Sequence, residues 1–296
     1  MGSAGLHAAP HPTARLVGTA PAMAALRAQI RHLATFDTVG SALVPTLLLQ
    51  GETGTGKGLV AHVIHDSGPR AGGPFVDVNC AAIPETMLEA ELFGFEPGAF
   101  TDAKRAKPGL FEVASGGTLF LDEIDALPLT LQGKLLTAIE AKQVRRLGAV
   151  VAHTVDVKLI AATNAALPEY MAAGRFRADL YHRLAVVVLL LPPLRQRGED
   201  MLVLAQAFFQ QYAAGLGVQP KRLNADAAAW LRGYAWPGNV RELSHVMERV
   251  TLLHTEEEVD GATLEQLALH QKSGQQSDAQ INENFLVSSR WFFETR

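Results

Sequence analysis

The sequence predicts an α/β protein in which a mainly parallel five-stranded sheet lies between layers of helices, followed by a small α-helical domain. Five short apolar runs have the length of strands, and stretches long enough for crossover helices separate them. The runs are Pro45–Gln50, Pro74–Asn79, Thr118–Asp122, Val157–Thr163 and Val186–Leu191. Continuous rather than alternating apolarity indicates strands covered on both faces, and the long connections favour parallel pairing. We therefore expect a three-layer sandwich.

A change of pattern after Pro192-Pro193 predicts a second domain made of helices. Helical periodicity continues through Leu202–Leu216, Ala225–Tyr234, Val240–Leu253 and Thr263–His270. We expect a flexible segment over residues 1–15, an α/β domain over 16–193 and a helical lid domain over 194–270. Residues 271–296 are rich in Gln, Ser and Asn and end in an aromatic cluster, which favours a disordered tail or a remnant of cloning.

Composition and charge exclude several broad classes of protein. The chain has 296 residues and a formal net charge of −4, so it has no overall attraction for phosphate backbones. One cysteine, Cys80, excludes an internal disulfide and favours a reducing compartment. The longest apolar run, Ala185–Leu191, falls far below the roughly 18 residues that span a bilayer, and residues 1–12 lack a signal-peptide pattern. We expect a cytoplasmic protein with no membrane partner.

A glycine-rich segment between the first strand and a helical stretch predicts a phosphate-binding loop. Its residues are Gly51, Glu52, Thr53, Gly54, Thr55, Gly56, Lys57 and Gly58. Glycines let backbone N–H groups turn toward phosphates, the following helix adds its positive N-terminal end, and Lys57 can reach the β- and γ-phosphates of a nucleotide. A glycine-rich turn with a surface lysine is the alternative interpretation of this segment alone.

Two carboxylates at the end of another strand strengthen the interpretation as a nucleotide site. Asp122 and Glu123 follow the apolar run that starts at Thr118, and ligands bind at the carboxyl ends of strands in such sheets. Asp122 is suited to holding Mg2+, through water, and Glu123 to polarising the water that attacks the γ-phosphate of ATP. A solvent-exposed acidic turn is the alternative, which the presence of both motifs disfavours.

Gly58 departs from the general phosphate-loop pattern, which has Ser or Thr at this position to bind Mg2+ through a hydroxyl group. Mg2+ keeps several waters and uses few protein ligands. We therefore expect the loss of this ligand to weaken nucleotide binding rather than abolish it, and to raise the Mg2+ concentration that ATP hydrolysis requires.

Residues from Leu16 to His270 resemble the AAA+ domain of sigma-54-dependent transcriptional activators, also called bacterial enhancer-binding proteins. The matching segments, in chain order, are Gly51–Gly58, Asn79–Pro84, Glu91–Gly94, Gly98–Ala103, Gly116–Ile124, Ala161–Asn164, Phe176–Leu184, Leu191–Arg197 and Trp236–Leu243. The resemblance implies a P-loop AAA+ module with a lid domain, assembled as a hexameric ring that binds ATP between subunits.

The same resemblance implies roles for five further residues. Asn164 is similar to the sensor I residue, which orients the attacking water, and Arg177 and Arg183 to arginine fingers that a neighbouring subunit inserts. Arg241 is similar to sensor II, which ties the position of the lid to the nucleotide state, and Asn79 to the switch asparagine that restrains Glu123. Strand or turn capping by the asparagines, and surface charge for the arginines, are the alternatives.

One loop departs from the family pattern where it is expected to touch a partner. The family loop reads Gly-Ala-Phe-Thr-Gly-Ala and contacts sigma-54; here the residues are Gly98, Ala99, Phe100, Thr101, Asp102 and Ala103. Asp102 replaces a glycine, which can take φ > 0 freely, and adds a negative charge. Phe95 and Pro97 replace a usual histidine and a basic residue, whereas the expected contact pair, Phe100 and Thr101, is intact.

We therefore expect a Mg2+-dependent ATPase whose active sites are shared between subunits and which remodels sigma-54 RNA polymerase to activate transcription. The alternative is an ATPase or nucleotide-sensing module of the same family that no longer engages sigma-54 because of Asp102. A repressor with a vestigial ATPase and a non-enzymatic scaffold are both disfavoured by the intact Asp122-Glu123 pair. We expect no DNA-binding domain in this chain, because no helix pair of the DNA-binding type follows His270.

Overall fold

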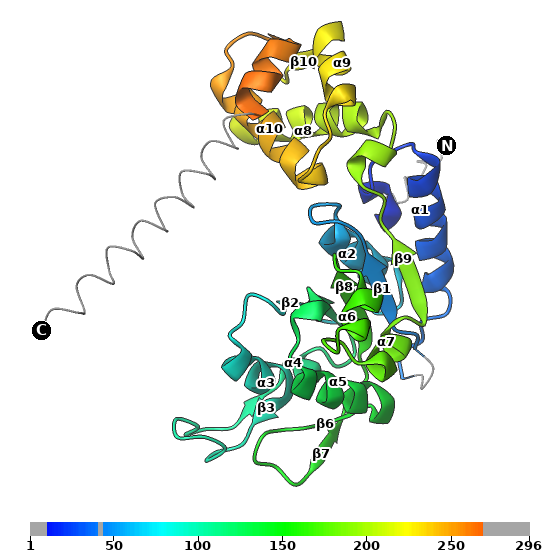
Figure 1. The fold of residues 1–296 in the computed structure, drawn as a ribbon, viewed down its shortest axis with the longest axis vertical. Helices are drawn as coiled ribbons and strands as arrows, with labels where there is room; N and C mark the ends of the chain where they lie inside the picture. The colour runs from blue at the N-terminus through cyan, green and yellow to red at the C-terminus, as the bar shows by residue number, and fades with distance from the viewer. Residues whose placement is uncertain (1–10, 41–43, 269–296) are drawn as a thin grey trace, which may run out of the picture. The chain divides into compact units, whose positions relative to one another are not determined.

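The computed structural model describes residues 11–40 and 44–268, and its first unit is built on a five-stranded sheet (Figure 1). The strands are β1 (Leu47–Gln50), β2 (Phe75–Asn79), β5 (Thr118–Asp122), β8 (Lys158–Thr163) and β9 (Val187–Leu190). Their order is β2-β5-β8-β1-β9, and every neighbouring pair is parallel. The predicted α/β fold class with a parallel five-stranded sheet is confirmed.

Helices cover both faces of this sheet, because alternate side chains of the strands point to opposite sides. Leu47 and Leu49 pack with buried side chains of α1 (Pro21–Ala34) and α2 (Lys57–Ser67). Leu48 packs on the other face with the remaining helices of the unit. These helices are α3 (Glu85–Phe93), α4 (Leu110–Val113), α5 (Leu129–Ala141), α6 (Leu167–Ala172) and α7 (Ala178–Leu184), and the short 3-10 turns are η1 (Pro12–Arg15), η2 (Ile124–Ala126) and η3 (Leu194–Gln196).

The five strands differ in how completely they are covered. All six residues of the central strand β8 are buried, as the continuous apolar run predicts. In β2, only Val78 is buried, and Asp77 and Asn79 are exposed. The prediction that both faces of every strand are covered is therefore wrong for β2 and for β9, in which only Leu189 is buried, because both lie at the edges of the sheet and have a strand neighbour on one side only.

Two hairpins extend from the first unit and contact each other (Figure 1). The first pairs β3 (Gly94–Phe95) with β4 (Lys107–Pro108), and the second pairs β6 (Gln143–Arg145) with β7 (Ala152–Thr154). The Glu96 amide donates to the Leu147 carbonyl at 2.9 Å, so the hairpins are joined by backbone hydrogen bonding. The loop over residues 98–103 lies at the tip of the first hairpin.

The second unit is helical and runs from Gly198 onward. It contains α8 (Asp200–Leu216), α9 (Ala225–Gly233), α10 (Asn239–Leu253) and a helical stretch over 261–268. The residue pairs β10 (Arg222–Leu223) and β11 (Glu258–Val259) form a parallel bridge too short for a sequence pattern to indicate. The predicted domain limit at 193 lies four residues before the last residue of the first unit, Arg197.

Some sequence predictions lie outside the part of the chain that the structure describes. They concern the tail over 271–296 and most of the N-terminal segment over 1–15, of which residues 1–10 are not described. Within residues 11–40 and 44–268, no helix combines the length and apolar character needed to cross a membrane.

Candidate nucleotide-binding site

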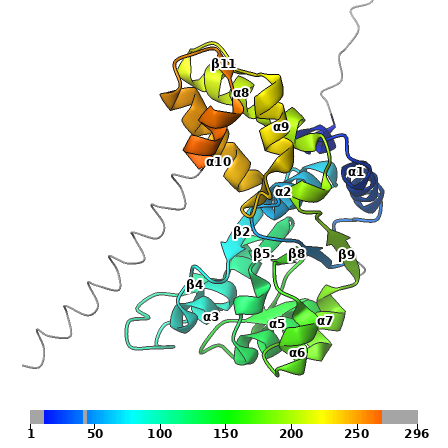
Figure 2. The same cartoon turned by 45° about the horizontal axis from the view of Figure 1, so that its top comes forward.

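The carboxyl ends of four strands bring the sequence-predicted residues together at one edge of the sheet. In the register of the sheet, Asn79 of β2 lies opposite Asp122 of β5, and Gln50 of β1 lies opposite Thr163 of β8. Because the strands are parallel, the residues that follow them converge at the same edge (Figure 2). The phosphate loop, the Asp122-Glu123 pair and Asn164 all start from this edge.

The phosphate loop takes a backbone shape that depends on glycine. Gly54 has φ 79° and Gly56 has φ 101°, in the left-handed region that residues with a Cβ rarely adopt. Gly51 is constrained by contact instead, because a Cβ there would lie 2.8 Å from the Leu191 carbonyl oxygen. The helix α2 begins at Lys57, directly after Gly56. The loop therefore presents the N-terminus of an eleven-residue helix to the edge of the sheet, as a phosphate-binding loop does.

The ammonium group of Lys57 lies inside the loop. The side chain is buried, and its Nζ donates to the carbonyl oxygens of Gly51 at 2.8 Å and Glu52 at 3.2 Å. Burying a cation is unfavourable unless polar groups surround it, and the loop carbonyls fulfil that need here. The charge is thus held at the point where the loop turns into α2, within reach of an anion bound there.

The acidic pair at the end of β5 has an unusual backbone. Glu123 has φ 53° and ψ 49°, a left-handed conformation that costs energy for a residue with a side chain and is found often at functional sites. Its amide donates to Oδ1 of Asp122 at 3.0 Å. Both neighbouring carboxylates are half-buried at the strand end.

The field around this pair is negative. Burial first, and then the charges of Asp122, Asp125 and Glu123, together raise the pKa of the Cys80 thiol to about 12. Burial, and then the Asp122 carboxylate, also raise the pKa of Asp77 above its usual range. Several carboxylates therefore share this edge of the sheet, and Asp122 at the strand end is a residue that could hold a cation.

Asn164 contacts the phosphate loop directly. Its Nδ2 donates to the Thr53 hydroxyl at 2.8 Å, which joins the end of β8 to the loop after β1. The preceding residue, Thr163, is buried and donates its hydroxyl to the Asp125 carboxylate. The sequence pattern gave no signal for this second pair, which fixes the end of β8 against the turn after Glu123.

Asn79 caps a turn. Its Oδ1 accepts from the amides of Ala81 at 2.9 Å and Ala82 at 3.1 Å, which is the turn role set out as the alternative. Its backbone neighbours Asp122 in the sheet register, so the side chain starts next to the acidic pair. Among the hydrogen bonds of the described residues, none joins Asn79 to Glu123, and the switch role stays a prediction.

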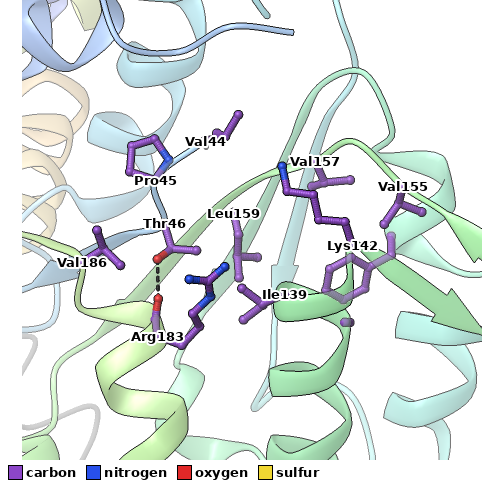
Figure 3. A pocket seen from close by; sticks show the side chains of 12 residues that line it. Val44, Pro45, Thr46, Ile139, Lys142, Val155, Val157, Leu159, Arg183 and Val186 are labelled. Atoms are coloured by element: carbon purple, nitrogen blue, oxygen red, sulfur yellow. Dashed lines mark hydrogen bonds between the residues drawn. The ribbon is translucent and has the colours of Figure 1, made fainter. Parts of the chain in front are cut away.

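Arg177 immediately precedes α7 and Arg183 lies within it. Arg183 is at the opposite edge of the sheet from the phosphate loop. Its backbone carbonyl accepts from the hydroxyl of Thr46, just before β1, and its side chain lines a pocket of about 210 Å³ with Leu159 and Val186 (Figure 3). These neighbours stand at or near the amino ends of β1, β8 and β9. Arg183 is therefore far from the phosphate loop of its own chain, which follows the carboxyl end of β1.

Arg177 stands at the start of α7 and is exposed. Its guanidinium forms a forked pair with Asp179, with Nε–Oδ1 and Nη2–Oδ2 distances of 3.0 and 2.7 Å. This pairing lowers the pKa of Asp179 and raises that of Arg177. Its backbone amide donates to Oε1 of Gln132, a buried residue of α5, so the helix start is anchored while the guanidinium remains at the surface.

The loop at the tip of the first hairpin is closed by its own backbone. The Gly98 amide donates to the Ala103 carbonyl at 2.8 Å, and Gly98 supplies the left-handed conformation with φ 82°. Asp102 does not have a positive φ, so replacing the family glycine introduces no backbone strain there. Phe100 is 43% exposed and packs edge-to-face on Phe95, with ring centroids 4.8 Å apart.

Arg241 belongs to the second unit. It is the third residue of α10 and is exposed. The turn before it contains two non-glycine residues with positive φ, Trp236 at 50° and Asn239 at 52°, both fully buried. This turn fixes the start of α10 and hence the direction in which the Arg241 side chain leaves the helix.

Comparison with known proteins identifies the family. The sigma-54 interaction domain matches residues 16–190, and an AAA+ ATPase lid domain matches residues 195–281. Similar curated proteins include the nitric oxide reductase transcription regulator NorR1 of Cupriavidus necator, 48% identical over 82% of this chain and 46% of the relative. The response regulator protein PilR of Pseudomonas aeruginosa is 44% identical over 91% of this chain and 59% of the relative. The chain thus spans about half the length of these relatives.

Solved structures agree with this assignment. NtrX from Brucella abortus in complex with ATP has a TM-score of 0.76 and 38% identity, covering 84% of this chain and 53% of that one; its complex with ADP has a TM-score of 0.75. A RuvB mutant from Thermotoga maritima, 16% identical with a TM-score of 0.55, shares the fold. The chain belongs to the sigma-54 interaction domain family of AAA+ proteins, whose members include the transcription regulators NorR and PilR.

Proposed function

We propose that this chain binds and hydrolyses ATP at the carboxyl edge of the sheet, as part of a ring that remodels sigma-54 RNA polymerase to activate transcription in the bacterial cytoplasm. The observation that carries the proposal is the convergence of the phosphate loop, the Asp122-Glu123 pair and Asn164 at that edge. The hydrogen bond from Asn164 to Thr53 links the loop to the adjoining strand end and supports a single site.

Each residue has a task in hydrolysis that follows from its position. Lys57 and the backbone amides at the start of α2 bind the β- and γ-phosphates. Glu123 accepts a proton from the attacking water, and Asn164 orients that water. When bound, Mg2+ neutralises phosphate charge, and Asp122 is the residue that would hold it, through water. Arg241, in the lid domain, ties the position of that domain to the nucleotide state.

The placement of Arg183 supports active sites shared between subunits. Arg183 lies at the amino edge of the sheet, whereas the phosphate loop lies at the carboxyl edge of the same chain. In a ring of subunits in head-to-tail contact, the amino edge of the sheet in one subunit lies next to the carboxyl edge of the sheet in its neighbour. Arg177 and Arg183 of one subunit then complete the site of the next, and a hexamer closes the ring. Arginine suits this task because it is always charged and its fork matches phosphate oxygens.

Mixing two inactive variants tests the shared site. Lys57→Ala removes phosphate binding but keeps the fingers, and Arg183→Ala keeps phosphate binding but removes one finger. Each alone is expected to lose ATP hydrolysis. In an equal mixture, roughly a quarter of the interfaces combine an intact Lys57 with an intact Arg183, so activity returns in part. Steady-state phosphate release measures it.

Arg175→Ala is the matched control for this experiment. Arg175 is an exposed arginine two residues before Arg177, and its guanidinium stacks on Tyr170 at 4.2 Å rather than pairing with a carboxylate. Its removal is expected to leave hydrolysis unchanged. Full activity of Arg183→Ala alone, or a mixture that stays inactive, would exclude sites completed in trans.

The exposed tip of the first hairpin supports sigma-54 as the partner. Phe100 lies at the surface beside Thr101 in a loop whose backbone closes normally despite Asp102. We propose that the ATP cycle moves the segment over residues 91–107 against the polymerase. The second candidate, an ATPase or nucleotide sensor that has left sigma-54, rests on the added negative charge of Asp102.

Gly58 is expected to raise the Mg2+ concentration required for hydrolysis, and Gly58→Thr to lower it. A Cβ at position 58 would have as its nearest neighbour Cε1 of Phe120 at 4.0 Å, so the position accepts a Cβ without a close contact. The added hydroxyl supplies the Mg2+ ligand that the general motif has at this position. Titration of ATPase activity with Mg2+ measures the change.

Gly58→Ala, which adds the Cβ without the hydroxyl, separates the metal effect from the helix stabilisation of about 1 kcal/mol expected on replacing glycine. Equal half-saturating Mg2+ for wild type and Gly58→Thr would contradict the prediction.

A further inference from the structure

A short strap of chain, residues 192–197, leaves the sheet after β9 and touches the phosphate loop before the second unit begins at Gly198. It contains η3 (Leu194–Gln196) and two arginines, Arg195 and Arg197. Each contacts a different end of the same turn of the phosphate loop.

Arg195 holds the side chain of Glu52 at the start of the turn. Its Nη1 lies 2.8 Å from Oε2 and its Nη2 lies 2.6 Å from Oε1, which is the forked arrangement that matches a guanidinium to a carboxylate. The pair joins residues that are 143 positions apart in the chain. Both side chains are more than two-fifths exposed, so the pair can open without the cost of leaving a charge buried.

Arg197 holds the other end of the turn through the backbone. It is 3% exposed, and its Nη2 donates to the Thr55 carbonyl at 2.9 Å while its Nε donates to the Pro192 carbonyl at 2.9 Å. A buried guanidinium is stable only where acceptors surround it. The contact therefore fixes the carbonyl of Thr55 relative to the strap.

The turn between these two contacts is also bonded to itself. The Glu52 carbonyl accepts from the Thr55 amide at 3.4 Å and the Thr55 hydroxyl at 2.8 Å, and it is one of the two carbonyls that hold Lys57. A change in the direction of Glu52 would thus move the acceptor of the Lys57 ammonium. The strap controls both ends of the segment on which the position of that ammonium depends.

We propose that Arg195 and Arg197 are positioning residues for nucleotide binding, which hold the turn Glu52–Thr55 in the shape that presents Lys57 and the loop amides to phosphate. The proposal rests on the proposed nucleotide site and deepens it. Neither arginine touches the phosphates. Arg197 sets the turn permanently through a buried contact, whereas the exposed Arg195–Glu52 pair tightens it.

Binding of a fluorescent ADP analogue to the full chain tests the Arg195–Glu52 pair. Arg195→Ala and Glu52→Gln are each expected to raise Kd about 5- to 10-fold, or about 1 to 1.4 kcal/mol. The combined variant is expected to weaken binding no more than either single change, because the two residues act through one contact. The swap Arg195→Glu with Glu52→Arg is expected to recover most of the affinity. For Arg195→Ala, the kcat at saturating ATP should change less than about twofold, because Arg195 does not take part in the chemical step.

A purely structural pair would behave differently. Arg222, paired with Glu257 at the surface of the second unit, is the control, and Arg222→Ala should leave Kd unchanged. Removing either exposed pair is expected to leave the melting temperature nearly the same, because exposed ion pairs contribute about 0–1 kcal/mol. An unchanged Kd for Arg195→Ala, independent effects of the two single changes, or a loss of affinity that follows a loss of stability would overturn the role of Arg195.

Arg197 requires a milder change because its side chain is buried. Arg197→Lys keeps the charge but cannot reproduce the fork to two carbonyls. It is expected to raise the ADP Kd at least as much as Arg195→Ala while the first unit, which contains Arg197 and its contacts, stays folded, as circular dichroism would show. Wild-type affinity in Arg197→Lys would overturn its role. Wild type and Lys57→Ala, measured in the same assay, distinguish this outcome from failure of the nucleotide site itself. If wild type does not bind the ADP analogue, the proposed function is wrong.

Discussion

Glu123→Gln is expected to reduce the rate of ATP hydrolysis by about 10²- to 10⁴-fold, the range over which a positioned general base contributes. Glutamine keeps the size of the side chain and the strained backbone at φ 53°, but it cannot accept the proton of the attacking water. Nucleotide binding should remain, because Lys57 and the loop amides are untouched. Single-turnover phosphate release measures the chemical step, and the ADP-analogue titration measures binding.

Glu140→Gln provides a matched control for that result. Glu140 is an exposed carboxylate near the end of α5, and its replacement is expected to leave both the rate and the affinity unchanged. Hydrolysis by Glu123→Gln at more than about a tenth of the wild-type rate would assign the base to another group. The neighbouring Asp125, which accepts from Thr163, would then be the first to examine.

Asp37→Ala is expected to destabilise the first unit by about 3–5 kcal/mol, because it breaks a buried ionic network. The Asp37 carboxylate accepts from Nε of Arg70 at 3.0 Å and from Nζ of Lys158 at 2.9 Å. The side chains of all three residues are at most 2% exposed. Burial already lowers the pKa of Lys158, and removing the shared anion would leave two cations together in the interior.

Denaturant unfolding followed by circular dichroism measures this loss. The control is Asp66→Ala, which removes the surface pair of Asp66 with Arg15 and is expected to cost about 0–1 kcal/mol. Arg70 also contacts Asp156, whose side chain is 29% exposed, so Asp156→Ala should fall between the two. If Asp37→Ala were no more destabilising than Asp66→Ala, the network would not be a source of stability.

The strands and the phosphate loop could be predicted because their signals are local. Apolar runs of strand length and glycines at fixed spacing carry the information within a few residues. The exposure of β2 could not be predicted, because the edge position depends on the order of strands in the sheet. A run such as Pro74–Asn79 has the same pattern whether one or two strands lie beside it.

Contacts between distant segments explain what the sequence did not indicate about the site. Asn164 was expected near the acidic pair, but its bond to Thr53, 111 positions away, depends on β8 lying next to β1. The Arg195–Glu52 pair crosses a longer separation still. The replacement of a family glycine by Asp102 indicated possible backbone strain from the loop sequence alone. In the structure, Gly98 rather than Asp102 takes the left-handed conformation of the loop.

Trapping with sigma-54 tests most directly the claim that this ATPase domain acts on that partner. The protein is mixed with sigma-54 and ADP with aluminium fluoride, which mimics the transition state of hydrolysis, and the mixture is separated by native electrophoresis. Asp102→Gly is run in parallel, and Phe100→Ala removes the exposed contact side chain. A stable complex with the native loop that is lost in Phe100→Ala is the result we predict. A complex formed only by Asp102→Gly, with none from the native loop, would contradict the account and indicate a ring that acts on another target.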